Sequence, residues 1–463
     1  MILTSDFYLK RMKRLKEIID KNLQGDPVIW AVVFALSLVS ILVVYSSIGT
    51  LAYRKSDSPE WVLFKHTAMV GLGLFAMWFA HRIDYRYYSK LSRLGLWISV
   101  PLLLYTFKYG TSLNEASRWL TIMGTSFQPS DFASLALIIN LASMLSKKQQ
   151  NIEDIKDALI PMLIWCGIIC GLIALSNFST AVLLFATCML VMFIGRVPIK
   201  YLAMLVLIGL LAGAAAAQFG ERWGTVKSRV MSFVDGKELP FQAKHAMIAV
   251  ASGGVAGKGP GNSDQRNILP HPYSDFIYAI VIEEYGMIGG VVVLILYLIL
   301  LHRGMKAAYN SERAFGGLLS AGLSFDLVCQ AMVNMGVVVG LGPITGQPLP
   351  LISMGGTALV FAGISVGIIL SVSRGEKDEE WNEGSKEFDN SDEPEKSRET
   401  KAKADNPDVD DDDADGREVL KEKLTTRKRS LETLANTPKE EVEGKRKGNS
   451  RIKNEDEVLF EMD

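Results

Sequence analysis

Residues 27–49 read PVIWAVVFALSLVSILVVYSSIG, a run without a single charged side chain. About 20 apolar residues suffice for a helix to cross the roughly 30 Å hydrocarbon layer of a bilayer, so this stretch predicts a transmembrane helix. Similar runs recur up to residue 374. We expect spans at residues 27–49, 61–83, 91–110, 130–146, 159–176, 178–197, 201–220, 276–302, 316–341 and 350–373. The predicted fold class is therefore an all-α integral membrane protein with ten transmembrane helices, in a membrane domain of residues 27–374.

The charges divide the chain into two parts. Residues 375–463 contain 29 acidic and 18 basic residues, whereas residues 1–374 contain 21 acidic and 31 basic residues. The basic residues of the first part are scattered between apolar runs, which argues against a nucleic-acid-binding protein. The second part has the composition of a disordered, charged tail.

The basic residues also predict the orientation in the membrane, because short loops rich in Lys and Arg stay on the cytoplasmic side. They gather in residues 1–26 and in alternate loops. Both termini are therefore predicted to be cytoplasmic, with residues 1–26 as a basic amphipathic segment on the inner leaflet. The long connection between the seventh and eighth spans, residues 221–275, then lies outside the cytoplasm. Its length and its apolar positions predict a packed, functional loop with a short helix near residues 247–255.

This loop contains the Gly-rich segment SGGVAGKGPGNS, residues 252–263, followed by Arg266. Glycines expose backbone N–H groups, and Lys258 and Arg266 add positive charge, which together suit a phosphate or a pyrophosphate. A nucleotide-binding P-loop is excluded, because the segment lacks the preceding strand and the Gly-Lys-Ser/Thr ending. A Gly-rich turn between two interfacial helices explains the same composition, so the residues alone leave both interpretations open.

Asp275 stands at the outer end of the eighth predicted span. It could cap the helix there, or it could act as a general base on a sugar hydroxyl beside the basic loop. Other costly polar residues lie inside the predicted spans, where they either line a polar cavity or pair to hold helices together. These residues are Lys65, His66, Glu283, Glu284, Asp326, Gln330 and Asn334.

Several motifs resemble, in the expected order, those of the SEDS family (shape, elongation, division and sporulation) of polytopic peptidoglycan polymerases. The matching residues are Arg118-Trp119, Gln128-Pro129-Ser130-Asp131, the Gly-rich segment, Ser274-Asp275-Phe276 and the segment GPITGQPLPLISMGGT, residues 342–357. The resemblance covers roughly residues 27–374. Gln347, the Ser-Met-Gly-Gly-Thr run and the long tail are more like the FtsW branch of this family than the RodA branch.

The resemblance implies glycosyl transfer with lipid II, in which an acceptor GlcNAc 4-hydroxyl attacks the anomeric carbon of a glycan held on undecaprenyl pyrophosphate. It implies that Asp275 is catalytic. The residues expected to bind substrate are Lys65, Arg118, Trp119, Lys244, Lys258, Asn262, Ser263, Arg266 and Glu283. No metal site is assigned, and a divalent cation such as Mg²⁺ is the one candidate cofactor.

The family also implies a bacterial inner-membrane protein at the division septum, working with a class B penicillin-binding protein of the FtsI type and other divisome proteins. Two other functions fit the residues. A lipid II flippase would use Asp326, Gln330, Asn334, Glu283 and Glu284 to line its path, although no inverted repeat is obvious. A non-catalytic scaffold would recruit partners through the tail. Polymerisation of lipid II already placed on the active side would separate the first function from both others.

Overall fold

The computed structural model describes residues 22–48, 58–113, 116–122, 125–149, 159–219, 228, 231, 233 and 239–374, without the side chains of residues 111–118, 121–125 and 210–219. The chain divides into a compact unit, Met1–Glu383, and a second unit, Gly384–Asp463. The predictions for residues 1–21 and for the tail from residue 375 lie outside the described residues. The described residues all lie in the first unit.

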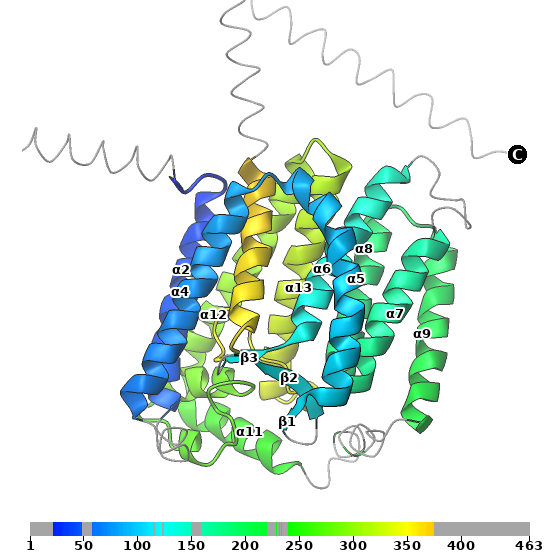
Figure 1. Ribbon diagram of the computed structural model, residues 1–463. Helices are drawn as coiled ribbons and strands as arrows, with labels where there is room; N and C mark the ends of the chain where they lie inside the picture. Colours follow the sequence, from blue (N-terminus) through cyan, green and yellow to red (C-terminus); the bar gives the residue numbers. More distant parts are fainter. Residues whose placement is uncertain are drawn as a thin grey trace, which may run out of the picture. The chain divides into compact units, whose positions relative to one another are not determined.

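A helix lies at each of the ten predicted positions, and the helices form one bundle (Figure 1). Among the described residues, five of these helices are long and apolar enough to cross a membrane, namely α2, α4, α6, α12 and α13. The total of ten crossings stays a prediction. The helices are α2 (Pro27–Ser47), α4 (Pro59–Arg82), α5 (Tyr85–Tyr109), α6 (Pro129–Lys147), α7 (Ile160–Ser176), α8 (Phe178–Ile194), α9 (Ile199–Phe219), α12 (Ile277–Asn310), α13 (Ala314–Val338) and a final helix, Ala358–Arg374.

Local sequence explains where several helices begin. The side chain of Asp26 accepts a hydrogen bond from Val28 N at 2.9 Å, and Pro27 occupies the first helical position of α2. Ser58 and Pro59 start α4 in the same way. Such a side chain satisfies a backbone donor that the helix leaves open, and proline at the first position needs no donor. The starts of these two helices therefore follow from the local sequence.

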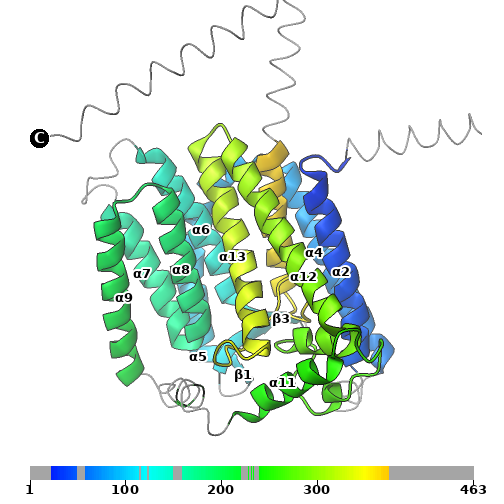
Figure 2. The same ribbon diagram turned by 180° about the vertical axis from the view of Figure 1, so that it is seen from behind.

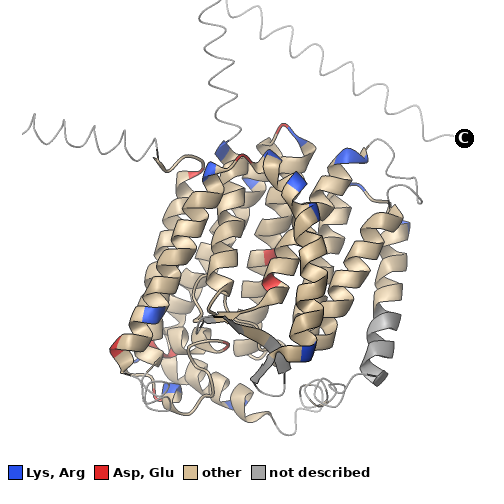
Figure 3. Ribbon diagram, in the orientation of Figure 1, with Lys and Arg blue, Asp and Glu red and all other residues tan. Residues whose placement is uncertain are grey.

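Lysines and arginines gather at one end of the bundle, which we call the basic end (Figure 3). Arg82 closes α4, Lys147 closes α6 and Arg303 lies in the last turns of α12. Because the helices run alternately up and down, these charges meet at one end, as the predicted loop asymmetry requires. The α11 helix (Phe241–Gly253) lies at the opposite end, across the start of α12 (Figure 2).

The eighth predicted span, 276–302, differs in the structure. The α12 helix extends to Asn310 and is kinked at Gly286, whose backbone has φ 71° and ψ −174°. All residues from Ile277 to Glu284 are buried, whereas Met287 and Ile288 expose more than half of their surface. The first two turns of α12 are thus enclosed by protein, and the lipid-facing helix begins after the kink.

The predicted all-α membrane fold class is confirmed, because the described residues are mostly helical. Details differ. A small antiparallel sheet that the sequence did not predict consists of β1 (Thr111–Leu113), β2 (Ala116–Ile122) and β3 (Thr125–Phe127), in which β2 pairs with both neighbours. The tenth span was predicted from residue 350, but the final helix begins at Ala358. Residues 342–357 form turns rich in glycine and proline, which do not continue a helix. The loop helix α11 is also longer than the predicted 247–255 and begins at Phe241.

Candidate active site

Asp275 is half-buried, just before α12 begins. Its Oδ1 accepts a hydrogen bond from Ser274 Oγ at 2.9 Å. The N-cap position of α12 is occupied by Phe276 and has no side-chain cap hydrogen bond. The capping interpretation of Asp275 therefore loses its main support, and the carboxylate is held by its neighbour at the surface of the membrane domain.

The backbone around Asp275 is held by α13. Asn334 Nδ2 donates to the carbonyl oxygen of Asp275 at 2.8 Å and to that of Gln347 at 2.7 Å. Asn334 is buried, and a buried amide that holds two carbonyls fixes both segments, because breaking either bond would leave a polar group unsatisfied. Gln347 Nε2 in turn donates to Thr180 Oγ1 of α8 at 2.6 Å. The position of Asp275 is thus tied to two helices distant in sequence.

The segment 347–357 connects Asp275 to the other motifs. Ser353 Oγ donates to the Ser274 carbonyl at 2.7 Å, and Met354 N donates to the Tyr273 carbonyl at 2.9 Å. At the far end of the segment, Thr357 N donates to Ser126 O at 3.3 Å and Gln128 N donates to Thr357 Oγ1 at 3.2 Å. The strand pair that carries Arg118 and Trp119 and the helix start at Pro129 are therefore joined, through one segment, to the residues just before Asp275.

The same segment reaches α2 and α4. Ser40 Oγ donates to Ile352 O at 2.6 Å and is 2.9 Å from His66 Nε2, and both residues are completely buried. Ser40 was not among the residues predicted from the sequence to be functional. The sequence contained a signal, because Ser37, Ser40 and Ser47 recur on one face of the mainly apolar helix α2 and are all buried.

Glu283 organises the Gly-rich segment. Its carboxylate is fully buried and accepts hydrogen bonds from Lys258 Nζ at 2.7 Å, from Ser252 Oγ at 3.2 Å and from Ser263 Oγ. The backbone N–H groups of residues 264 and 265 donate to it as well. Its oxygens are surrounded by the protein's own donors, so the predicted direct contact of Glu283 and Ser263 with substrate does not fit this arrangement.

The glycines of this segment allow its backbone to lie directly on the kink of α12. Lys258 N donates to Glu283 O and Gly259 N to Glu284 O, both at 2.9 Å. A Cβ atom at Gly257 would lie 2.2 Å from the carbonyl oxygen of Glu284, well inside contact distance. The predicted use of these N–H groups for a phosphate is therefore not supported at residues 258 and 259, whose donors bind α12.

Arg266 and Glu284 join the loop to α2. Arg266 Nη1 donates to the Ser46 carbonyl at 3.1 Å, and Ser46 Oγ donates to Glu284. Glu284 and Ser46 are both buried. Glu283 and Glu284, adjacent in sequence, thus hold two different elements against the kink of α12.

The remaining predicted binding residues lie in varied surroundings. Lys65 and Lys244 are exposed on α4 and α11, and Lys65 Nζ lies 5.1 Å from the centre of the Trp61 ring. Asn262 is exposed, and its amide donates to the Lys258 carbonyl at 3.1 Å. Trp119 is half-buried on β2 beside Arg118, whose side chain lies outside the described atoms.

Lys258 links the buried network to solvent. Its Nζ lies 2.8 Å from Asp264 Oδ2 in addition to its contact with Glu283. The hydrogen bond to Asp264, followed by that to Glu283, raises the pKa of Lys258. The hydrogen bond from Lys258 lowers the pKa of Asp264. Lys258 therefore stays protonated and its charge is shared between two carboxylates.

Polar side chains on α13 also form hydrogen bonds within the protein. Gln330 Nε2 donates to Asp326 Oδ2 at 2.9 Å, and Asn334 holds two carbonyls as described above. Among the described residues, no group of three or more His, Cys, Asp and Glu side chains could hold a metal ion. Mg²⁺ is often bound by one or two carboxylates and by substrate phosphates, which needs no such group, so the divalent cation stays a prediction.

Comparison with known proteins places this arrangement in a family. The model of the FtsW/RodA/SpoVE family, described as cell cycle protein, matches residues 26–378. The chain is 32% identical to stage V sporulation protein E of Bacillus subtilis over 76% of its own length and 98% of that protein. It is also 32% identical to the probable peptidoglycan glycosyltransferase FtsW of Geobacter metallireducens, over 75% of the chain and 94% of that protein.

Two solved structures share the fold. The crystal structure of the rod shape determining protein RodA of Thermus thermophilus aligns with a TM-score of 0.57 at 24% identity, covering 76% of this chain and 97% of RodA. A chain from a peptidoglycan synthase complex, described as coordinating polymerization and crosslinking, aligns with a TM-score of 0.61 at 24% identity, covering 76% and 98%. The multi-pass helical fold is therefore the one that these proteins share.

Proposed function

The chain belongs to the FtsW/RodA/SpoVE family, and from that premise we propose that it is a peptidoglycan glycosyltransferase that polymerises lipid II into glycan strands. The observation that carries the proposal is the placement of Asp275. Its carboxylate lies half-buried where α12 begins, and its backbone is held by Asn334 while its neighbours are held by the segment 347–357. A general base needs such a fixed position, because proton transfer depends on geometry within a few tenths of an ångström.

In the proposed reaction, Asp275 accepts the proton of the acceptor's GlcNAc 4-hydroxyl while that oxygen attacks the anomeric carbon of the donor. The bond from that carbon to the pyrophosphate breaks, and the pyrophosphate leaves with the electron pair. Pyrophosphate leaves without protonation, so the reaction has less need of the second protein acid that glycoside hydrolysis uses. Ser274, whose hydroxyl donates to Asp275, orients the base.

Basic side chains would offset the charge that develops on the pyrophosphate. Lys65 and Lys244, which are exposed, and Arg118 on β2 are the candidates for this role. Lys258 and Arg266 are bonded to the protein itself, so we assign them to positioning the loop. This divides the predicted binding residues into those that meet substrate and those that hold the loop.

We further propose that the protein acts in septal wall synthesis in the inner membrane, with both termini cytoplasmic and with a class B penicillin-binding protein as its partner. The similarity to a chain of a peptidoglycan synthase complex supports a partner that crosslinks the strands. The basic end of the bundle supports the orientation, since positive loops stay in the cytoplasm.

A reconstitution assay tests the proposed activity. The full-length chain in liposomes, with and without its class B partner, is given fluorescent lipid II on both leaflets, and the products are separated by size before and after muramidase digestion. We expect a ladder of muramidase-sensitive strands. Movement of lipid II between leaflets without strand formation would instead establish a flippase. If the folded, partner-bound chain neither forms strands nor moves lipid II, the scaffold function would remain.

A further inference from the structure

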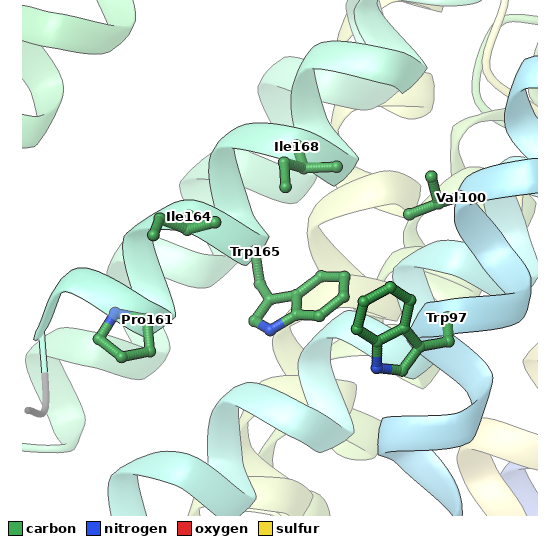
Figure 4. A pocket seen from close by; sticks show the side chains of 6 residues that line it. All are labelled: Trp97, Val100, Pro161, Ile164, Trp165 and Ile168. Carbon is green, nitrogen blue, oxygen red and sulfur yellow. The ribbon is translucent and has the colours of Figure 1, made fainter.

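A groove of about 370 Å³ opens between α5 and α7, outside the site described above. Its volume falls within the range of about 300–1,000 Å³ that is typical of ligand sites. The rings of Trp97 and Trp165 meet edge to face across it, with their centres 5.4 Å apart (Figure 4). The groove is lined by Trp97, Val100, Pro161, Ile164, Trp165 and Ile168.

The groove belongs to the lipid-facing surface of the bundle. Trp97 exposes 64% of its surface and Ile164 exposes 52%. No side chain that lines the groove is charged. In a protein that spans a membrane, such a surface meets hydrocarbon, so its natural occupant is an apolar chain.

Two cations lie above the groove on the same helix. Arg93 and Lys90 precede Trp97 by four and seven residues, so they lie on the same face of α5 as Trp97. At 1.5 Å per residue they are about 6 and 10 Å nearer the basic end than Trp97. Both are exposed. Helical side chains point toward the start of their helix, so the Lys90 amine and the Arg93 guanidinium both extend toward the basic end. A cation on a lipid-facing surface is costly unless an anion or water meets it.

We propose that this groove and these two cations form a binding site for one anionic phospholipid of the leaflet at the basic end. One acyl chain lies in the groove along the paired rings of Trp97 and Trp165, and the phosphate contacts Lys90 and Arg93. Basic residues beside a groove between membrane helices are suited to anionic headgroups, whereas a neutral lipid or a transmembrane helix would fill the groove without neutralising the charges. This lipid site is separate from Asp275, so its existence does not depend on whether the chain polymerises lipid II.

Quenching of tryptophan fluorescence tests the site. The full chain is placed in phosphatidylcholine nanodiscs that contain a small fraction of phosphatidylglycerol with brominated acyl chains, which quench tryptophan on contact. The signal of the groove is the difference between the wild type and the variant Trp97→Phe/Trp165→Phe, because the chain has 8 tryptophans. We expect about a tenfold preference of the groove for brominated phosphatidylglycerol over brominated phosphatidylcholine.

The variant Lys90→Gln/Arg93→Gln should abolish this preference while random contact with bulk lipid remains. Lys306→Gln/Arg313→Gln removes the same charge at the same end of the bundle, on α12 and before α13, and should leave the preference unchanged. Equal quenching by both lipids in the wild type would overturn the proposal in favour of an unselective hydrocarbon groove. Quenching by brominated polyprenyl phosphate alone would overturn it in favour of the substrate's own tail.

Discussion

The two ends of the helical bundle are built in different ways. At the basic end, most Lys and Arg side chains lie near helix ends and are exposed, and the ion pair between Arg303 and Asp26 at 2.6 Å is itself partly exposed. At the opposite end, buried polar groups join residues that are far apart in sequence, such as Ser46 with Arg266 and Gln128 with Thr357. Substitutions of exposed residues at the basic end should therefore have small effects, whereas those of buried polar residues at the opposite end should spread through a connected network.

The largest effect expected at the network end is on chemistry. Asp275→Asn keeps the size and most hydrogen bonds of the side chain but removes the proton acceptor, so polymerisation of lipid II should fall by roughly two or more orders of magnitude. Thermal stability and partner binding should stay near wild type. The readout is the rate of strand formation by the purified chain with its partner.

The matched control lies at the basic end. Asp84→Asn makes the same chemical change at the cap of α5, where Asp84 accepts from Arg86 N at 2.9 Å. Asparagine caps a helix as well as aspartate, so activity and stability should hardly change. Near-normal strand synthesis by Asp275→Asn would defeat the assignment of the base and redirect the search to Asp326.

The second expected effect concerns Glu283. Glu283→Gln removes the negative charge that accepts hydrogen bonds from the Lys258 amine and two backbone N–H groups. The free energy of unfolding should fall by about 1.5–3 kcal/mol, the usual value of a hydrogen bond to a charged group. Activity should fall together with the melting temperature, because the loop is held by this carboxylate. The comparison variant is Glu60→Gln in the exposed first turn of α4, which should be silent. A large activity loss at unchanged stability would instead show that Glu283 meets substrate.

The same contrast explains what the sequence alone could predict. Helix positions and the basic end follow from local patterns, namely apolar length, capping residues such as Asp26 and the spacing of charges. The kink at Gly286 was missed because it depends on contact with the Gly-rich segment about 30 residues earlier in the chain. The small sheet was missed because its strands, of 3, 7 and 3 residues, are too short for a clear alternating pattern. The motifs identified Asp275, but only the fold shows that the Glu283 carboxylate accepts hydrogen bonds from the Lys258 amine and from a backbone N–H group.

A third, smaller effect tests the backbone contact between the Gly-rich segment and α12. Gly257→Ala places a Cβ atom 2.2 Å from a backbone carbonyl, and Gly257 also has a φ of 83°. Gly261→Ala is the matched control, since its φ is 79° but nothing lies within 4 Å of the added atom. Both variants carry the strain of a left-handed alanine, about 1 kcal/mol. Gly257→Ala should be less stable than Gly261→Ala in thermal unfolding, and equal melting temperatures would show that the segment does not rest on α12.

The smallest effect concerns the solvent-exposed edge of the network, the pair of Lys258 and Asp264. Because the hydrogen bond from Lys258 lowers the pKa of Asp264, the pair stabilises the fold at pH values above the ordinary carboxyl pKa, and this contribution is lost as the pH falls through the lowered pKa. The raised pKa of Lys258 keeps the amine charged up to at least its ordinary pKa. The melting temperature of Asp264→Asn should therefore lie slightly below that of wild type by a constant amount from about pH 5 to about pH 9, and the gap should close in stronger acid.

High salt should also narrow this difference in melting temperature, since the Lys258–Asp264 pair is exposed. The effect of Glu283→Gln should persist in salt, because that carboxylate is buried. A salt-independent gap for Asp264→Asn would mean that this exposed edge behaves like the buried network, and that the boundary between them lies farther out than Lys258.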